Sequence, residues 1–275
     1  MLTDPEKTVK LIREHTKTYI KNNNIQSLVI GVSGGIDSAL CAALVRPVCD
    51  NLKIALVGYS IPIETNKEDE IVRARNIGKH FCTAFKEIDL THTYNDIVKG
   101  FGIFYYNTTG NIDDKIRLGN LKARIRMMYL YNMAHKRKGM VLSTDNYTEW
   151  LMGFWTRFGD QGDFGMIQNL WKTEVYQVSD VICEKELWKQ NKVESIKSLK
   201  SCVHAVPTDG LGITDSDLDQ LGASSYEEVD HVMMDFLEHG KSKDCPIYDT
   251  PVVQRYINTT GKRNLPFNIE RKDII

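Results

Sequence analysis

Gly31-Val32-Ser33-Gly34-Gly35-Ile36-Asp37-Ser38 is the stretch that decides the fold of this chain. It joins an apolar run at 27–30, which predicts a buried strand, to a helix-forming run at 39–45. Gly34 and Gly35 have no Cβ, so the backbone can approach an anion there, and the first N–H groups of the following helix point toward it. The stretch therefore predicts a phosphate-binding turn between a strand and a helix.

Asp37 distinguishes this turn from the common nucleotide-binding loop, which ends in Gly-Lys-Ser or Gly-Lys-Thr. A carboxylate can approach a phosphate group only when a divalent cation lies between them. Asp37 therefore predicts a magnesium ion at the turn. The alternative interpretation is a plain strand-to-helix turn that happens to be rich in small residues.

Strands and helices are predicted to alternate along the rest of the chain. Further strands are predicted at 53–59, 85–88 and 139–143, and further helices at 5–22, 67–81, 119–137, 226–237 and 250–257. This order favours an α/β fold with three α/β/α layers and a doubly wound, mainly parallel sheet. Such sheets bind ligands beyond the carboxyl ends of their strands, where the glycine-rich turn is expected to lie.

The composition narrows the class of protein. With 275 residues, 42% of them hydrophobic, the chain can bury the core of a single domain over 1–275. A formal net charge of -1 speaks against general nucleic-acid binding, which demands a basic excess. No apolar run approaches the roughly 20 residues of a membrane span, and the N-terminus is charged and amphipathic, unlike a signal peptide. We therefore expect no membrane partner.

The cysteines point to a reducing compartment. The chain has six of them, without a CxxC pair or a zinc-binding spacing: Cys41, Cys49, Cys82, Cys183, Cys202 and Cys245. This pattern favours buried thiols in a cytoplasmic protein.

The glycine-rich turn also resembles the SGGxDS signature of the ATP pyrophosphatases of the adenine-nucleotide hydrolase-like fold. The resemblance implies that residues 31–38 grip the pyrophosphate of ATP. With the β- and γ-phosphates held as a leaving group, the electrophile is the α-phosphorus, and an attacking carboxylate becomes an acyl-adenylate. Such turns activate acids and do not transfer the γ-phosphoryl group.

A second motif lies in the long predicted helix. Residues 120–127, Asn-Leu-Lys-Ala-Arg-Ile-Arg-Met, resemble the NxKARxRM element of the ammonia-dependent NAD synthetase family. The resemblance implies that Asn120 and Arg126 bind the substrate. Lys122 and Arg126 lie one turn apart, so both are expected to meet an anionic ligand. An amphipathic helix with a solvated basic face is the alternative.

The segment after the predicted strand at 139–143 carries a third motif. Thr144-Asp145-Asn146-Tyr147-Thr148-Glu149 resembles the TDxxxE of NAD synthetases, which implies that Thr144 contacts ATP and that Glu149 binds magnesium together with Asp37. From the sequence alone, Thr144 or Asp145 would only cap the next helix.

The loop at 156–163 resembles the family's TKYGDGGxD and is one residue shorter. Arg157 stands at the lysine position and Asp163 at the last aspartate, so the resemblance implies that both bind deamido-NAD. Lys172 falls where the family places a lysine on the ATP phosphates. A lysine in the first turn of a helix is the alternative interpretation of Lys172.

Two more motifs follow toward the C-terminus. Pro207-Thr208-Asp209 resembles the PTxD that begins a mobile loop, which implies that Thr208 contacts ATP and that 207–225 close over the reactants. The tail at 261–266 resembles HKRxxP, which implies substrate binding by Gly261 and Lys262. Gly261 stands where the family has histidine.

Taken over nearly the whole chain, the resemblance implies ATP-dependent amidation of deamido-NAD with ammonia to give NAD, AMP and pyrophosphate, without a nucleophilic side chain. It also implies a homodimer, for which the helix at 121–133 offers Leu121, Ile125, Met128 and Tyr129.

The chain departs from the family where Ser60-Ile61-Pro62 replaces the usual Arg-Leu-Pro. With Gly261 and the shorter loop, this concerns the dinucleotide pocket more than the ATP site. Two alternatives therefore stay open: an amide ligase for another carboxylate, and a module that binds ATP without turnover.

Overall fold

The computed structural model describes residues 2–64, 66–103, 111–208, 216–239, 246–263 and 269–273. Within them, five strands form one sheet in the order β3-β2-β1-β4-β5, and each neighbouring pair is parallel. The strands are β1 (Ser27–Gly31), β2 (Ala55–Ser60), β3 (Ala84–Glu87), β4 (Met140–Ser143) and β5 (Phe164–Gly165). The strand order reverses between β1 and β4, so a ligand crevice is expected at the carboxyl ends of these two strands.

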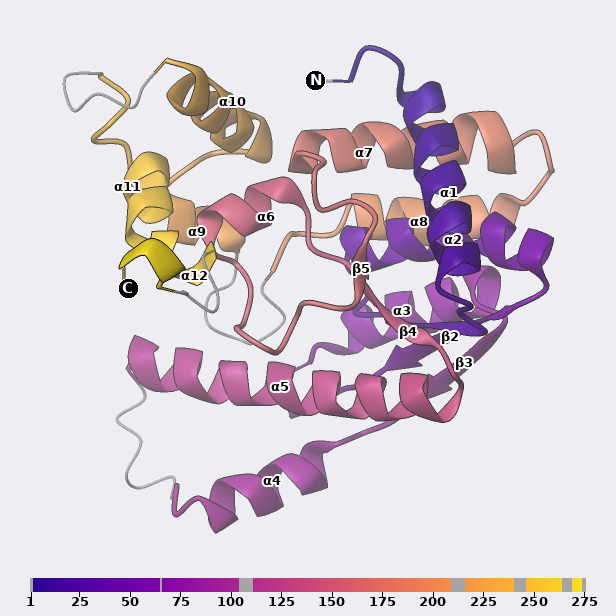
Figure 1. Ribbon diagram of the computed structural model, residues 1–275, viewed down its shortest axis with the longest axis horizontal. Coiled ribbons are helices and arrows are strands. Elements are labelled where there is room, and N and C mark those ends of the chain that lie inside the picture. Colours follow the sequence, from indigo (N-terminus) through magenta and orange to yellow (C-terminus); the bar gives the residue numbers. More distant parts are fainter. Residues whose placement is uncertain are drawn as a thin grey trace.

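Helices cover both faces of the sheet (Figure 1). One layer contains α1 (Pro5–Asn22), α2 (Ile36–Leu52), α3 (Glu68–Phe81), α7 (Lys172–Val181), the π-helix η2 (Ile182–Leu187) and α8 (Val193–Val203). The other face is covered by α5 (Ile112–Lys136), and α4 (Thr91–Gly100) lies outside α5. The predicted three-layer α/β/α fold is confirmed.

A third group of helices lies beyond the end of β4, on the left of Figure 1. It consists of α6 (Tyr147–Met152), α9 (Asp217–Leu221), α10 (Tyr226–Glu238), α11 (Pro251–Asn258) and α12 (Thr260–Arg263). These helices share a hydrophobic cluster of their own, with Met152, Val229, Met233 and Val253 at its centre. The short helix η3 (Arg271–Asp273) lies near the C-terminus.

The core explains why β1 is apolar without alternation. Leu28 and Ile30 face the layer of α1, α2 and α7, whereas Val29 between them packs toward α5 with Met127 and Leu130. A strand buried on both faces needs apolar side chains at every position. The run at 27–30 is therefore the central strand of the sheet.

Three details differ from the sequence-based expectations. The helix predicted from Gly119 begins at Ile112, because the Asn111 side chain accepts a hydrogen bond from the N–H of Asp114 at 2.9 Å and two aspartates follow in the first turn. The cap of α6 is Asn146, whose Oδ1 accepts from the N–H of Glu149 at 3.0 Å, and not Thr144 or Asp145. The helix α4 carries no motif and was not expected.

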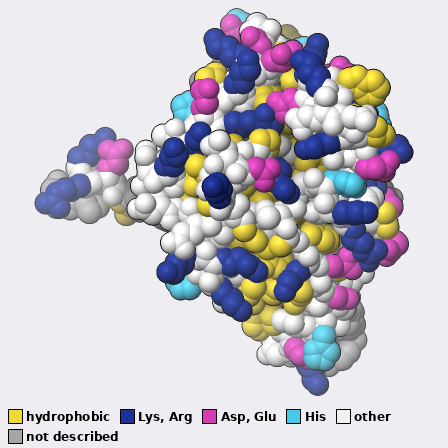
Figure 2. Space-filling view, turned by 90° about the vertical axis from the view of Figure 1, so that its right-hand side faces the viewer, with side chains coloured by type: hydrophobic (Ala, Val, Ile, Leu, Met, Phe, Trp, Pro, Cys, Tyr) yellow, Lys and Arg dark blue, Asp and Glu magenta, His cyan; other side chains and the backbone are white. Residues whose placement is uncertain are grey.

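Two further expectations concern buried cysteines and membrane-spanning segments, and the described residues bear on both. Five thiols, Cys41, Cys49, Cys82, Cys183 and Cys202, are free and buried, and Cys245 lies outside the described residues. No described helix is long and apolar enough to cross a membrane. On the face shown in Figure 2, acidic side chains lie among the lysines and arginines.

Candidate active site

A cavity of about 520 Å³ lies at the carboxyl ends of β1, β2 and β4. Its wall contains most of the site residues predicted from the sequence: Gly31, Val32, Ser33, Gly35, Ile36, Asp37, Ser38, Asn120, Arg126, Thr144, Glu149, Lys172, Thr208 and Lys262. Four predicted residues are not part of this wall: Gly34, Arg157, Asp163 and Gly261. The fold thus gathers most of the candidate positions, spread over residues 31–262, around one space.

The glycine-rich turn is held in shape by its own serines. The hydroxyl oxygens of Ser33 and Ser38 lie 3.1 Å apart, and the Ser33 hydroxyl accepts from the N–H of Gly35 at 3.2 Å. Gly34 has φ +87°, and a Cβ there would come within 2.2 Å of the carbonyl oxygen of Glu70 in α3. Only glycine fits at position 34, so the turn can lie tightly against α3.

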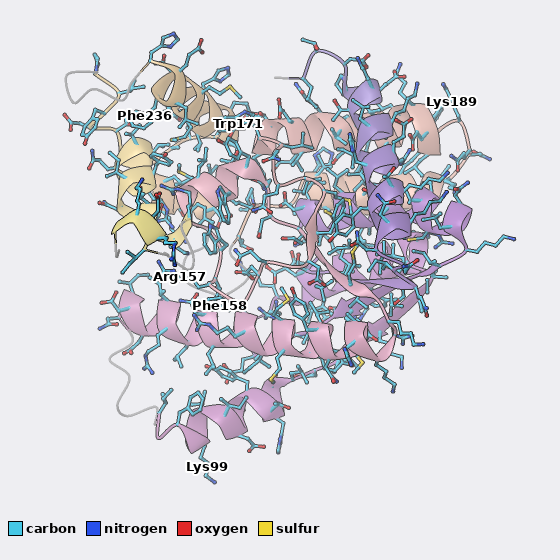
Figure 3. The ribbon with its side chains drawn as sticks, viewed as in Figure 1. Lys99, Arg157, Phe158, Trp171, Lys189 and Phe236 are labelled. Carbon is cyan, nitrogen blue, oxygen red and sulfur yellow. The ribbon has the colours of Figure 1, made fainter. Side chains whose placement is uncertain are left out.

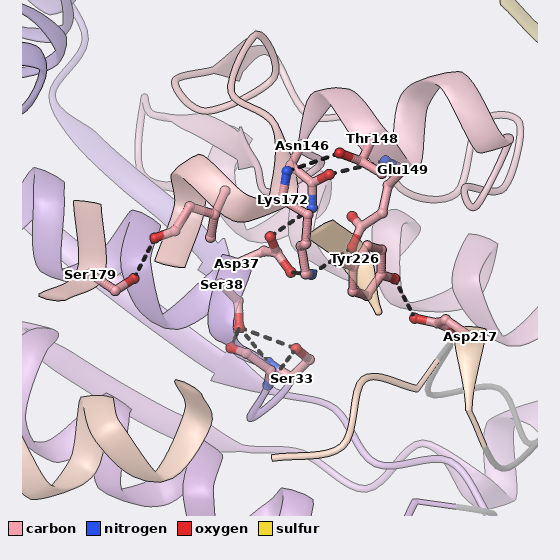
Figure 4. Close-up of polar contacts among 12 residues, drawn as sticks. Ser33, Asp37, Ser38, Asn146, Thr148, Glu149, Lys172, Ser179, Asp217 and Tyr226 are labelled. Atoms are coloured by element: carbon pink, nitrogen blue, oxygen red, sulfur yellow. Dashed lines mark hydrogen bonds and ion pairs between the residues drawn. The ribbon is translucent and has the colours of Figure 1, made fainter. Parts of the chain in front are cut away.

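Lys172 joins two acidic side chains from different helices (Figure 4). Its Nζ donates to Oδ2 of Asp37 at 2.5 Å and to Oε1 of Glu149 at 2.8 Å. Asp37 lies in the first turn of α2, Glu149 lies in α6, and Lys172 begins α7 and is 3% exposed. The structure therefore places two carboxylates around a single ammonium group, next to the phosphate-binding turn.

The pKa values show how strongly these charges depend on one another. Burial, and then the negative charge of Asp37, raises the pKa of Glu149 to about 7, although Lys172 acts against this shift. Burial lowers the pKa of Lys172, but Asp37 and Glu149 outweigh it and raise this pKa well above its usual value. Lys172 thus stays a cation, and the two carboxylates need a positive charge between them.

These two carboxylates fit the magnesium ion that the sequence predicts. Magnesium in nucleotide sites is commonly held by one or two carboxylates together with phosphate oxygens. Asp37 and Glu149 already converge on one cation, Lys172 Nζ. Their oxygen atoms are therefore suitable ligands once the ammonium group turns away.

Asn146 is a site residue that the sequence analysis missed. Its Nδ2 donates to Oδ1 of Asp37 at 2.8 Å, and its Oδ1 accepts from the N–H of Glu149 at 3.0 Å. One side chain thereby links the carboxylate of Asp37 to the backbone of Glu149. The sequence could have indicated Asn146, because Asn is a favoured cap residue just ahead of a helix.

Asp230 of α10 forms hydrogen bonds that hold the residues next to Glu149 and Lys172. It is 1% exposed, and its carboxylate accepts from the hydroxyl of Thr148 at 2.5 Å and from the N–H and hydroxyl of Thr173 at 2.9 and 2.8 Å. Thr148 in turn accepts from the N–H of Lys172 at 2.9 Å. Asp230 therefore connects the residues beside Glu149 and Lys172.

The other end of the cavity contains two anchored cations. Arg126 donates through Nε to the carbonyl of Ile61 at 2.9 Å and through Nη2 to Oδ1 of Asn66 at 2.8 Å. Lys262 donates to the carbonyl of Gly153 at 2.6 Å and lies 4.8 Å from the ring centre of Trp155. Burial lowers the pKa of Lys262 to about 8.

Buried polar groups line this second end as well. The hydroxyl of Thr156 donates to Oδ1 of Asn120 at 2.6 Å, and the N–H of Thr156 donates to Asp160. Burial raises the pKa values of Asp145 and Asp160, and the charges of Asp160 and Glu149 add to the shift of Asp145. Both carboxyl groups belong to the cavity wall.

Three basic or acidic residues of the motifs lie away from the cavity wall. Oδ2 of Asp163 accepts from the N–H of Val141 at 2.8 Å, so this side chain continues the pairing with β4. Arg157 is exposed, and its Nη2 donates to the carbonyl of Gly261 at 2.7 Å; Figure 3 shows it near α12. Lys122 forms an ion pair of 3.2 Å with Glu64 and does not join Arg126 at the cavity, contrary to expectation.

Comparisons with known proteins agree with the motifs. A sequence model described as NAD synthase matches residues 8–264. The chain is 27% identical to the NH(3)-dependent NAD(+) synthetase of Thermoplasma acidophilum, over 98% of this chain and 100% of that protein. It is 30% identical to the protein of the same name from Pyrococcus furiosus, over 94% of this chain and 93% of that protein.

A solved structure shares the fold. The NMN synthetase from Francisella tularensis superposes with a TM-score of 0.77 and 24% identity, covering 98% of this chain and 100% of that one. Because the family model spans most of the sequence, from the first helix to the residues after α11, the assignment does not depend on any single motif. The chain belongs to the NAD synthase family.

Proposed function

We propose that this protein catalyses the ATP-dependent amidation of deamido-NAD with ammonia, giving NAD, AMP and pyrophosphate. The observation that carries the proposal is the contact of Lys172 with both Asp37 and Glu149 beside a phosphate-binding turn, inside a cavity that also contains half-buried cations. The NH(3)-dependent NAD(+) synthetases to which the chain is similar along nearly its whole length support the same reaction.

In the first step, a carboxylate oxygen of deamido-NAD forms a bond to the α-phosphorus of ATP. The bond from this phosphorus to the oxygen that bridges to the β-phosphate breaks, and pyrophosphate leaves. Residues 31–38, Thr144, Thr208 and Lys172 hold ATP, and Lys172 turns from its carboxylates toward the departing phosphates. Asp37 and Glu149 would hold magnesium, which would offset the charge that develops on the leaving group.

In the second step, ammonia attacks the acyl carbon of the adenylate, and AMP leaves. The attacking nitrogen must lose a proton. Asp145 and Asp160 lie in the cavity wall with raised pKa values, so either carboxylate is placed to accept that proton. No side-chain nucleophile takes part.

The substrate lies toward the second end of the cavity. Asn120, Arg126 and Lys262 line that end and are assigned to deamido-NAD. Arg157, Asp163 and Gly261 are assigned to the same substrate through their motifs alone, since they lie away from the cavity wall.

The chain acts as one domain over residues 1–275, and the segment 207–225 closes over the reactants to exclude water. Thr208 and Asp217 line the cavity on either side of residues 209–215, which lie outside the described residues. An adenylate shielded in this way reacts with ammonia before water reaches it.

The protein also forms a homodimer through α5, in the cytoplasm. Met128 of α5 is 61% exposed, and Tyr131 beside it is 38% exposed, so this face offers apolar area to a second copy. The expectation that Ile125 contributes is wrong: it is 3% exposed and packs against Tyr94 and Val98 of α4. The free, buried thiols support the cytoplasmic location.

The test is a product assay with ATP, magnesium, ammonium and deamido-NAD. We expect NAD, AMP and pyrophosphate in equal amounts, and no AMP when the dinucleotide is left out. ADP and phosphate in place of AMP would contradict the mechanism. A panel of other carboxylates, scored by AMP release, separates this activity from a ligase for another acid, and ATP binding without pyrophosphate release would indicate a regulatory module.

A further inference from the structure

Arg73 of α3 lies at the phosphate-binding turn, yet none of the motifs contains it. Its Nε donates to the carbonyl oxygen of Gly34 at 3.0 Å, and its Nη1 forms an ion pair of 2.7 Å with Asp69. The side chain is 17% exposed and lines the same cavity as Asp37 and Lys172. A permanent positive charge is therefore attached to the tip of the turn.

The contacts of the cavity's cations single out Arg73. Five lysines and arginines of the described chain line the cavity: Arg73, Arg126, Lys172, Arg255 and Lys262. Of these five described cations, only Arg73 and Lys172 form hydrogen bonds to residues 31–38. Arg126 contacts Ile61 and Asn66, and the other two contact residues 152–155. The phosphate-binding end of the cavity thus has two cations.

These two cations differ in how fully they are paired. Lys172 already serves two carboxylates, Asp37 and Glu149. Arg73 has one carboxylate partner, Asp69, whose side chain is 63% exposed, and its Nη2 has no hydrogen-bond partner among the described residues. A guanidinium presents donors in a planar fork that suits phosphate oxygens, and an exposed ion pair is weak enough to be exchanged.

The residue at the end of β2 cannot supply a positive charge for phosphate binding. Ser60, at the end of the strand, is buried, neutral and part of the cavity wall. A positive charge is present instead on α3, the helix that follows β2. Cys202 of α8 lines the same cavity as Arg73. Burial raises the pKa of Cys202 to about 11, and the charge of Arg73 acts against this shift.

We propose that Arg73 binds the pyrophosphate part of ATP from the α3 side of the turn, through its Nη2, while Lys172 binds it from the α7 side. This assignment rests on the proposed function, since it takes the turn to be the pyrophosphate site. It adds a phosphate-binding residue that the chain's motifs do not contain.

The test uses two substitutions of Arg73, which separate the effect of its charge from the effect of its hydrogen bond to Gly34. Arg73→Gln keeps an amide donor for the Gly34 carbonyl and loses the charge, whereas Arg73→Lys keeps the charge and loses the fork. The matched control is Arg75→Gln on the same helix, because the Arg75 guanidinium pairs with Glu68 and Glu87 and does not line the cavity. Dissociation constants of ATP, pyrophosphate and AMP are measured by titration calorimetry with magnesium.

We expect Arg73→Gln to weaken the binding of ATP and pyrophosphate by about tenfold or more. AMP has no β- or γ-phosphate, so its affinity should change by less than about twofold, which also shows that the variant is folded. Arg73→Lys should recover most of the loss, and Arg75→Gln should match the unaltered protein.

Two results would overturn the assignment of Arg73 and leave the proposed function standing. One is ATP and pyrophosphate affinity in Arg73→Gln equal to that of the unaltered protein. The other is an equal loss for AMP, which would indicate that Arg73 only shapes the turn. If the unaltered protein bound neither ATP nor pyrophosphate, the proposed function itself would fall, and the role of Arg73 with it.

Discussion

The Nζ atom of Lys172 lies 2.5 Å from Oδ2 of Asp37, although the two residues are 135 positions apart in the chain. The ammonium group also contacts Glu149, so it stands where two carboxylates would hold a divalent cation. A divalent cation held by the same two carboxylates would compete with the lysine for this position. Exchange between them would free Lys172 for the phosphates at the moment when magnesium and ATP arrive.

Lys172→Met tests this exchange without relying on activity. Removing the ammonium leaves two buried carboxylates facing each other, and we expect a loss of about 3 kcal/mol of folding stability. Magnesium should then raise the Tm of the variant more than that of the unaltered protein, because it replaces the missing charge. Sodium chloride at equal ionic strength is the control, and an equal magnesium shift in both proteins would argue against a shared cation position.

Asp37→Asn should leave the fold intact and reduce turnover by orders of magnitude, since one metal-binding charge is lost where charge develops on pyrophosphate. Asp50→Asn is the matched control, because Asp50 lies at the other end of α2 and pairs with Arg46 at the surface. Steady-state AMP release measures both. Activity of Asp37→Asn within roughly tenfold, or about 1.4 kcal/mol, would show that Asp37 is not a principal ligand.

Asp230→Ala should destabilise the protein by about 3 kcal/mol, because the donors of Thr148 and Thr173 lose a buried charged acceptor. It should also lower kcat, since the residues next to Glu149 and Lys172 lose their support. Urea unfolding and kinetics on the remaining folded protein measure the two effects. Asp235→Ala, on an exposed position of the same helix, should change neither; if it behaved like Asp230→Ala, the effect would belong to α10 as a whole.

We expect the pKa of Lys262 to make both the folding stability and the binding of deamido-NAD depend on pH. Burial lowers its pKa from 10.5 to about 8, so the folded protein favours the neutral amine. The protonated form costs stability below about pH 8, and this cost disappears as the pH rises toward 10.5. Substrate binding should show the opposite trend: the KM for deamido-NAD rises above about pH 8 as the charge is lost, while the KM for ATP changes little.

Lys262→Arg is the control for this pH effect. Arginine stays charged throughout the range, so the rise in KM for deamido-NAD should vanish. The same rise in the arginine variant would assign the titration to another group.

Local sequence explains the central strand, its turn and the helix after it. The run at 27–30 is apolar at every position because it is buried on both faces, and Gly34 is needed where α3 comes close. The apolar run and the glycine pair are visible in the sequence, although the elements that require them lie far away along the chain. The early start of α5 was missed because its signal is a single cap, Asn111, followed by acidic residues.

Contacts between distant residues could not be predicted in this way. Asp230 is 82 positions from Thr148, and Arg73 is 39 positions from Gly34. Nothing in either side chain's neighbourhood in the sequence shows a buried network or a cavity. The convergence of Asp37, Glu149 and Lys172 was expected only because each belongs to a motif of a known family. Lys122 shares a helix face with Arg126 but pairs with Glu64, so a shared helix face predicts a common ligand less well than a motif does.

The most direct measurement of the proposed reaction follows an oxygen atom. Deamido-NAD labelled with ¹⁸O in both carboxylate oxygens is turned over with ATP, magnesium and ammonium, and the products are analysed by mass spectrometry. If the carboxylate attacks the α-phosphorus, one labelled oxygen stays on that phosphorus, so each AMP carries one ¹⁸O and pyrophosphate carries none. Unlabelled AMP, or label in phosphate released with ADP, would contradict the acyl-adenylate mechanism.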